Sequence, residues 1–138
     1  SVEIAPLEIV GDQSYNLLVT KIVLLDLFVP YLPYSTQLEA RGGLRPYSWA
    51  EEQIPDSMAL ALLLAGIDTT DWGLSSEMEL ESDGSISAWM TDVSDAQTVH
   101  IPVVDIDITG YFFFAEVTDS QDPAETAAAV FVIPTVPL

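Results

Sequence analysis

The sequence predicts an all-β fold, a β-sandwich or a small barrel, on the strength of three observations. Apolar and polar residues alternate over several stretches, as they do in strands with one buried face. Turn-forming Gly, Pro and Asp residues separate these stretches. Hydrophobic residues make up 49% of the 138 positions, too many for a disordered chain even at a formal charge of −19. We therefore expect one folded domain, residues 1–138, with an acidic surface.

Charge and cysteine content exclude several classes of function. The chain has no cysteine, which removes disulfides, thiol nucleophiles and thiolate metal sites. Its 22 acidic residues against three Lys and Arg would repel nucleic acid and anionic lipid, so we expect no nucleic-acid partner. The most apolar run, residues 22–32, is shorter than the ~20 residues of a membrane span. It also contains Asp26 and Pro30 and is better explained as a soluble strand.

The first half of the chain contains two extended segments and a tight turn. Residues 15–31 and 34–40 are predicted to be extended, and the Gly-Gly pair that follows allows the chain to reverse. Tyr47 and Trp49 then alternate onto one face. Two large rings on one face predict a core anchor.

The second half begins with the one helical signal and continues as strands. Residues 56–66, "DSMALALLLAG", have an N-cap candidate in Asp56, good helix formers and a terminal glycine, so we expect a short helix. Alternation on both sides of Asp83-Gly84 predicts a hairpin, in which the pair supplies the positive φ angles of a tight turn. Gly110 is expected to mark a bulge or bend in a long strand. "ETAAAVFVIPTV" is predicted to be the last strand.

Four segments, in order, resemble a known family. "LPYSTQLEARGGLRPYSW", "IPDSMAL", "DGSISAWMT" and "GYFFFAEVTDSQDPAETAAAVFVIPTV" are similar to the Ig-like and cadherin-like (dystroglycan-type) repeats of bacterial surface proteins. The similarity covers roughly residues 32–136 and implies an antiparallel Ig-like or cadherin-like sandwich, used in adhesion or as a spacer, without a catalytic site. Ser57, Ala88 and Thr91 depart from the family pattern, and an extra stretch separates "IPDSMAL" from "DGSIS". Residues 1–31 precede the similar part as an extra strand segment.

Aromatic residues on both faces of the later strands raise the question of what covers them. The resemblance places Tyr111 and Phe113 in the core, with Phe112 and Phe114 on the outer face. Phe131 lies in a second strand that is apolar on both faces. An antiparallel sheet with one wet face should alternate more cleanly. Either the outer rings are covered by residues 15–31 or 56–74, or Phe112, Phe114 and Phe131 form an interface with a partner.

Calcium is the cation that the acidic residues would suit. Asp105 and Asp107 share one face of a strand, and Glu116, Asp119 and Asp122 surround the next turn. Neighbouring carboxylates repel one another, and a hard cation with oxygen ligands would relieve that repulsion. The alternative is a solvated acidic face without bound metal.

Catalysis is not expected. The single histidine, His100, would have to serve as the base of any Ser-His-Asp arrangement, and no serine has a nucleophile-elbow pattern. We therefore expect a non-enzymatic module at the cell surface or outside the cell. It would associate with itself or with neighbouring surface domains as a building block of a filament or another assembly. The alternative is a monomeric calcium- or carbohydrate-binding adhesion module of a larger surface protein.

Overall fold

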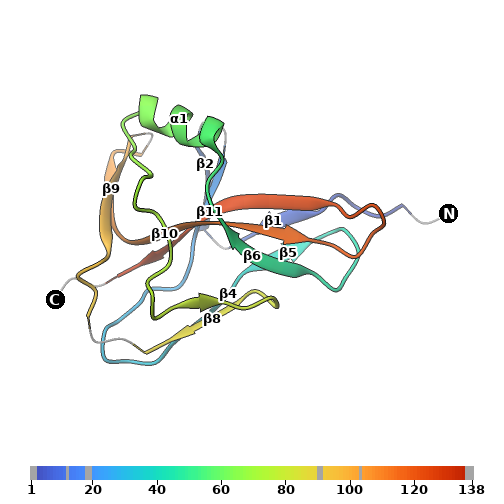
Figure 1. Ribbon diagram of the computed structural model, residues 1–138, viewed down its shortest axis with the longest axis horizontal. Coiled ribbons are helices and arrows are strands. Elements are labelled where there is room, and N and C mark those ends of the chain that lie inside the picture. Colours follow the sequence, from blue (N-terminus) through green and yellow to red (C-terminus); the bar gives the residue numbers. More distant parts are fainter. Residues whose placement is uncertain (1–2, 12, 18–19, 90–91, 103, 136–138) are drawn as a thin grey trace.

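A computed structural model describes residues 3–11, 13–17, 20–89, 92–102 and 104–135. The chain is mostly β-structure, arranged in several sheets with one short helix, α1 (Asp56–Leu64) (Figure 1). The strands are β1 (Glu8–Val10), β2 (Gln13–Leu17), β3 (Thr20–Leu24), β4 (Tyr34–Gln37), β5 (Glu39–Arg41), β6 (Ser48–Glu52), β7 (Glu79–Leu80), β8 (Ser85–Ala88), β9 (Gln97–Ile101), β10 (Ile106–Thr118) and β11 (Thr126–Pro134).

The largest sheet is built around the long hairpin of β10 and β11. Its order is β2-β3-β11-β10-β6, and β9 pairs with the first part of β10 on the edge that β6 occupies further along. The pairs are antiparallel except for β3 and β11, which run parallel. We expected a purely antiparallel arrangement, and this pair corrects that expectation. It brings an early strand beside the last one.

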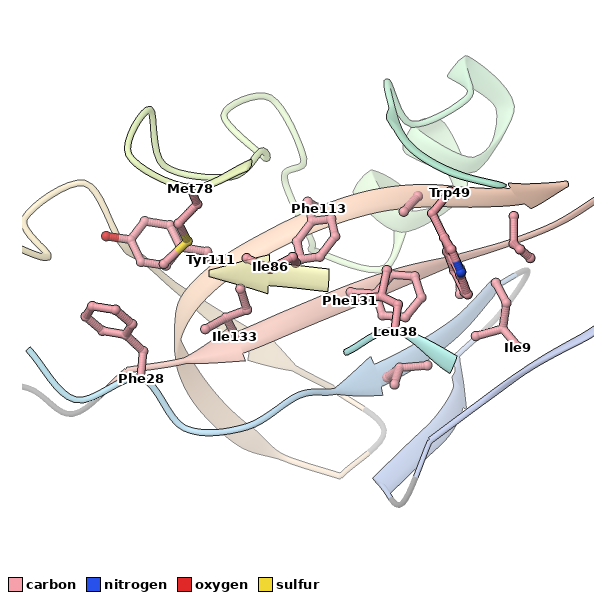
Figure 2. Packing of buried hydrophobic residues seen from close by; sticks show 14 of the residues in the cluster. Ile9, Phe28, Leu38, Trp49, Met78, Ile86, Tyr111, Phe113, Phe131 and Ile133 are labelled. Atoms are coloured by element: carbon pink, nitrogen blue, oxygen red, sulfur yellow. The ribbon is translucent and has the colours of Figure 1, made fainter. Parts of the chain in front are cut away.

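A second layer covers one face of the large sheet and encloses the first hydrophobic cluster. This layer consists of the three-stranded sheet β4-β8-β7 and the two-stranded sheet β1-β5. Trp49, Tyr111 and Phe113 are buried in the cluster, and Tyr47 packs against it, so the four predicted core residues lie in or beside the core. Figure 2 shows the cluster, which includes Ile9, Phe28, Leu38, Trp49, Met78, Ile86, Tyr111, Phe113, Phe131 and Ile133.

The opposite face of the large sheet is covered by α1 and the chain that follows it. Phe112 and Phe114 are only 2% and 7% exposed there. The ring of Trp72 stacks on Phe112 at 5.3 Å, and Leu62 of α1 is buried in the same cluster. This second cluster consists of Leu17, Ile22, Leu62, Ile67, Val99, Ile101, Phe112, Phe114, Val130 and Val132.

The predicted interface is therefore wrong in the position it gave to the three phenylalanines. Phe112 and Phe114 do point away from the first cluster, but residues of the 56–74 segment cover them. Phe131 is 0% exposed and stacks on Phe113 inside the first cluster. Strands of this sheet are apolar on both faces because both faces are buried by the chain itself.

Most of the local elements predicted from the sequence form, but some of their details differ. The helix begins at Asp56, but Pro55 occupies the N-cap position and no side chain caps it. The Asp83-Gly84 turn forms, with a positive φ at Gly84 alone. Gly110 lies within continuous β10, where a Cβ atom would meet the carbonyl oxygen of Ile133 at 2.2 Å, so the glycine permits close pairing. Within the described ranges, no helix has the length and apolar character needed to cross a membrane.

Candidate functional site

The turn at Gly42 and Gly43 is hydrogen-bonded to the N-terminal segment and to Tyr47. Gly42 and Gly43 have φ angles of +75° and +56°, in the left-handed region that glycine favours. The N–H of Gly43 donates to the carbonyl oxygen of Ala5 at 2.7 Å, which ties down the N-terminal segment. The hydroxyl of Tyr47 donates to the carbonyl oxygen of Gly42 at 2.6 Å and closes the turn. The turn is thus a structural junction.

Asp119 connects this junction to the β10–β11 hairpin. Its carboxylate accepts the N–H groups of Leu44 at 3.0 Å, Gln121 at 3.1 Å and Glu125 at 2.8 Å, and it also contacts the side-chain amide of Gln121. Burial would raise the pKa of Asp119, but these hydrogen bonds outweigh it and lower the pKa to about 2. The negative charge of Asp119 is satisfied by N–H donors of the chain itself.

The five residues predicted to bind calcium do not come together. Asp105 and Asp107 lie before and at the start of β10, whereas Glu116, Asp119 and Asp122 lie toward or beyond its other end. An extended strand rises about 3.3 Å per residue, so the two groups are far apart. Among the residues that the structure describes, no three His, Asp or Glu side chains form a group suited to a metal ion. The five residues therefore do not form a single site.

His100 makes cross-strand contacts with two of these carboxylates. Its Nδ1 lies 2.7 Å from Oδ1 of Asp107, and its Nε2 lies 3.2 Å from Oδ1 of Asp105. Asp107 is the register partner of His100 across the β9–β10 pair. Both ring nitrogens of His100 contact carboxylates, so the side chain helps to hold β9 and the start of β10 together.

The hydroxyl groups of two buried tyrosines also have structural partners. The hydroxyl of Tyr111 donates to Asp95 at 2.6 Å; burial and this acidic neighbour both raise the pKa of Tyr111. The hydroxyl of Tyr34 donates to the carbonyl oxygen of Asp26 at 2.7 Å. Burial raises the pKa of Tyr34 to about 12, so the phenol stays neutral and remains a donor.

The feature that sequence reasoning missed is a groove on the open side of the two-layer structure. It has a volume of about 490 Å³ and lies between β3, with the chain that follows it, and the β4–β5 run. Its lining includes Val23, Asp26, Gln37, Glu39 and Phe131. No local signal reveals this groove, because it depends on which strands of the two layers lie opposite each other.

No protein-family model and no curated protein sequence matches this chain.

Proposed function

We propose that the chain is a non-enzymatic structural module that carries tension within an extracellular surface assembly, built as an Ig-like sandwich. The observation that supports this role best is the parallel pairing of an early strand with the last strand. This is the structural role expected from the sequence, except that the buried Phe112, Phe114 and Phe131 take no part in association with other molecules.

The parallel contact extends beyond the two strands. Within them, Ile22, Val23 and Leu24 are the register partners of Val130, Phe131 and Val132. Further along, the N–H of Leu25 donates to the carbonyl oxygen of Val132, and the N–H of Phe28 donates to that of Pro134, each at 2.8 Å. Phe28 and Thr135 form a final parallel bridge.

This geometry suits a force applied through the two chain ends. Figure 1 shows those ends at opposite ends of the long axis. β1 and β2 lie between the N-terminal end and β3, and tension would first detach them from β5 and β3. It would then pull β3 from its start and β11 from its end, so the two parallel strands would slide past each other. The hydrogen bonds between them lie across the pulling direction and are loaded together. A pair that is pulled apart from one end breaks its bonds one at a time and yields at lower force.

Closure of both sheet faces supports the same role. The first cluster is covered by the second layer and the second cluster by α1 and residues after it. A module whose core needs no partner can keep its fold while its neighbours move.

A paired substitution tests the proposal. Leu25→Pro removes the N–H that donates to Val132, within the parallel contact. Asn16→Pro lies in edge strand β2, which pairs with β3 and not with β11. In single-molecule pulling through the chain ends, we expect Leu25→Pro to lower the main unfolding force far more than Asn16→Pro. The two variants are first compared by chemical denaturation to correct for equilibrium stability. Equal loss of force after that correction would refute the proposed role of the β3–β11 pair.

A further inference from the structure

The groove runs along an unoccupied strand edge. The N–H of Leu38 donates to the carbonyl oxygen of Gly84, so Leu38 and the alternate residues before it bond toward β8. Ser35 and Gln37 alternate with them, and their backbone N–H and C=O groups therefore point to the opposite edge of β4. Within the described part of the chain, β8 is the sole strand paired with β4.

The N-terminal strand covers the next part of this edge and then leaves it. β1 pairs with β5, the continuation of β4, with Val10 opposite Glu39 and Glu8 opposite Arg41. The chain then crosses to β2 in the large sheet. Gly11 and Gln13 line the groove at this crossing. The edge of β4 beside Ser35 and Gln37 is thus the place where a strand would continue the line of β1.

The lining of the groove has an apolar floor and an acidic rim. Leu25 and Leu27 supply accessible apolar surface to this lining, and Val23 and Phe131, 1% and 0% exposed, are core residues beneath it. Asp26 and Glu39 are exposed carboxylates of the same groove. A strand has side chains alternating between two faces, so an occupant with apolar residues facing the floor would present its other residues to the carboxylates and solvent.

Charge indicates which occupant fits. Two of the three basic residues, Lys21 and Arg41, pair with Glu8, at 3.9 and 2.9 Å. The third, Arg45, lies over the ring of Tyr47 and lines a neighbouring hollow that also includes Glu39. Among the described residues, neither Asp26 nor Glu39 takes part in an ion pair. The formal charge of −19 adds a long-range attraction for a cationic partner.

A second copy of the chain fits less well. It would bring another −19 charges. Its β1 is already paired with β5, and its β11 lies between β3 and β10 in the large sheet. Neither terminal strand is free to be donated from the folded chain.

We propose that the edge of β4 beside Ser35 and Gln37 binds an extended peptide segment of alternating apolar and basic residues, which adds a strand to the β4-β8-β7 sheet. The backbone of the peptide pairs with the two outward-facing residues, its apolar side chains rest on the groove floor, and its basic side chains approach Asp26 and Glu39. This binding activity is independent of the tension-bearing role, and either can fail without the other.

The probe is a short synthetic peptide of alternating valine and lysine with blocked ends. Its control has the same sequence with alternate backbone nitrogens methylated, which keeps the charge but removes the N–H groups needed for strand pairing. Titration into the whole 15N-labelled chain should shift the amide signals of Ser35 and Gln37. We expect the unmethylated peptide to bind at least about tenfold more tightly, the scale of losing a few backbone hydrogen bonds.

Substitutions separate the charge contribution from the strand-edge contribution. Asp26→Asn and Glu39→Gln should each weaken binding by about two- to fivefold, the scale of an exposed ion pair. Glu79→Gln, on β7 at the other edge of the same sheet, removes the same charge and should leave binding unchanged. Ser35→Pro removes one outward N–H from an edge where proline is tolerated, and it should weaken binding without unfolding the chain.

Several results would overturn the proposal. Equal affinity for the methylated and unmethylated peptides would show that the peptide binds by general charge attraction and not by strand pairing. This comparison uses the wild-type chain, so it holds even if the Ser35 variant does not fold. Shifts confined to amides outside β4 would place the site elsewhere. Changes at Ser35 and Gln37 with protein concentration alone would indicate that a second copy occupies the edge.

Discussion

Trp49 and Phe131 meet edge to face in the first cluster, with ring centroids 6.0 Å apart and planes inclined at 75°. Trp49 comes from edge strand β6 and Phe131 from the middle of β11, so their contact ties the edge of the large sheet to its centre. The aromatic anchor predicted from the sequence therefore lies at a junction within the core.

Trp49→Ala should lower the free energy of unfolding by roughly 3–5 kcal/mol, because it removes a large ring that is 4% exposed. Arg41→Ala is the control. Its guanidinium lies 2.9 Å from Glu8, but the side chain is 70% exposed, and its loss should cost less than about 1 kcal/mol. Urea denaturation measures the free energy of unfolding of both variants. Similar losses in the two would show that Trp49 is not a core residue.

Phe112→Ala should also destabilise the chain by roughly 3–5 kcal/mol, because the ring is covered by Trp72 and residues near α1. Leu64→Ala, at a leucine that is 82% exposed on α1, should change stability by no more than about 0.5 kcal/mol. Sedimentation of the wild type and both variants accompanies denaturation. A Phe112 variant that keeps its stability and loses self-association would restore the interface predicted from the sequence.

Asp119 should make the chain sensitive to acid. Its pKa in the fold, about 2, lies below its usual value of 3.8, so the fold favours the ionised form. The resulting stabilisation is complete above 3.8 and is lost as the pH falls from there through about 2. Melting temperatures of the wild type and Asp119→Asn, recorded across this range, should converge at the acid end. A constant difference would show that the ionisation of Asp119 contributes nothing.

Calcium should stabilise the chain no more than sodium at matched ionic strength. A ligand bound by the native state alone raises the melting temperature by mass action, whereas screening depends on ionic strength. The structure separates Asp105 and Asp107 from Asp119, so we expect screening alone. Differential scanning fluorimetry in the two salts makes the comparison, and a specific gain with calcium would require a site that the described residues do not form.

Local patterns predicted much of the fold, because they depend on near neighbours. The structure contains three features predicted in this way: the alternation of Tyr47 and Trp49, the Asp83-Gly84 turn and the helical segment after Pro55. The Ig-like assignment stays a prediction, since strand order depends on contacts between distant residues. The parallel β3–β11 pair carries no signal in either strand alone.

The same limit explains the errors at the candidate sites. A strand that is apolar on both faces says that Phe112 will be covered, but not whether the chain or a partner covers it. Acidic residues close in sequence suggest a metal site, but the carboxylate of Asp119 accepts hydrogen bonds from the N–H groups of Leu44 and Glu125. The groove beside Gln37 arises from the crossing between β1 and β2, which no residue pattern marks.

The most direct test of the central claim compares two directions of pulling on one chain. In the first, single molecules are held by the two chain ends, which shears β3 against β11 once β1 and β2 have detached. In the second, they are held by the C-terminal end and by a cysteine replacing Leu27, an exposed residue between β3 and Phe28. This second geometry peels Phe28 and then Leu25 away from β11 one bond at a time. Forced unfolding reports the barrier along each direction, and we predict a force several times higher for shear than for peeling. Equal forces in the two directions would contradict the tension-bearing role.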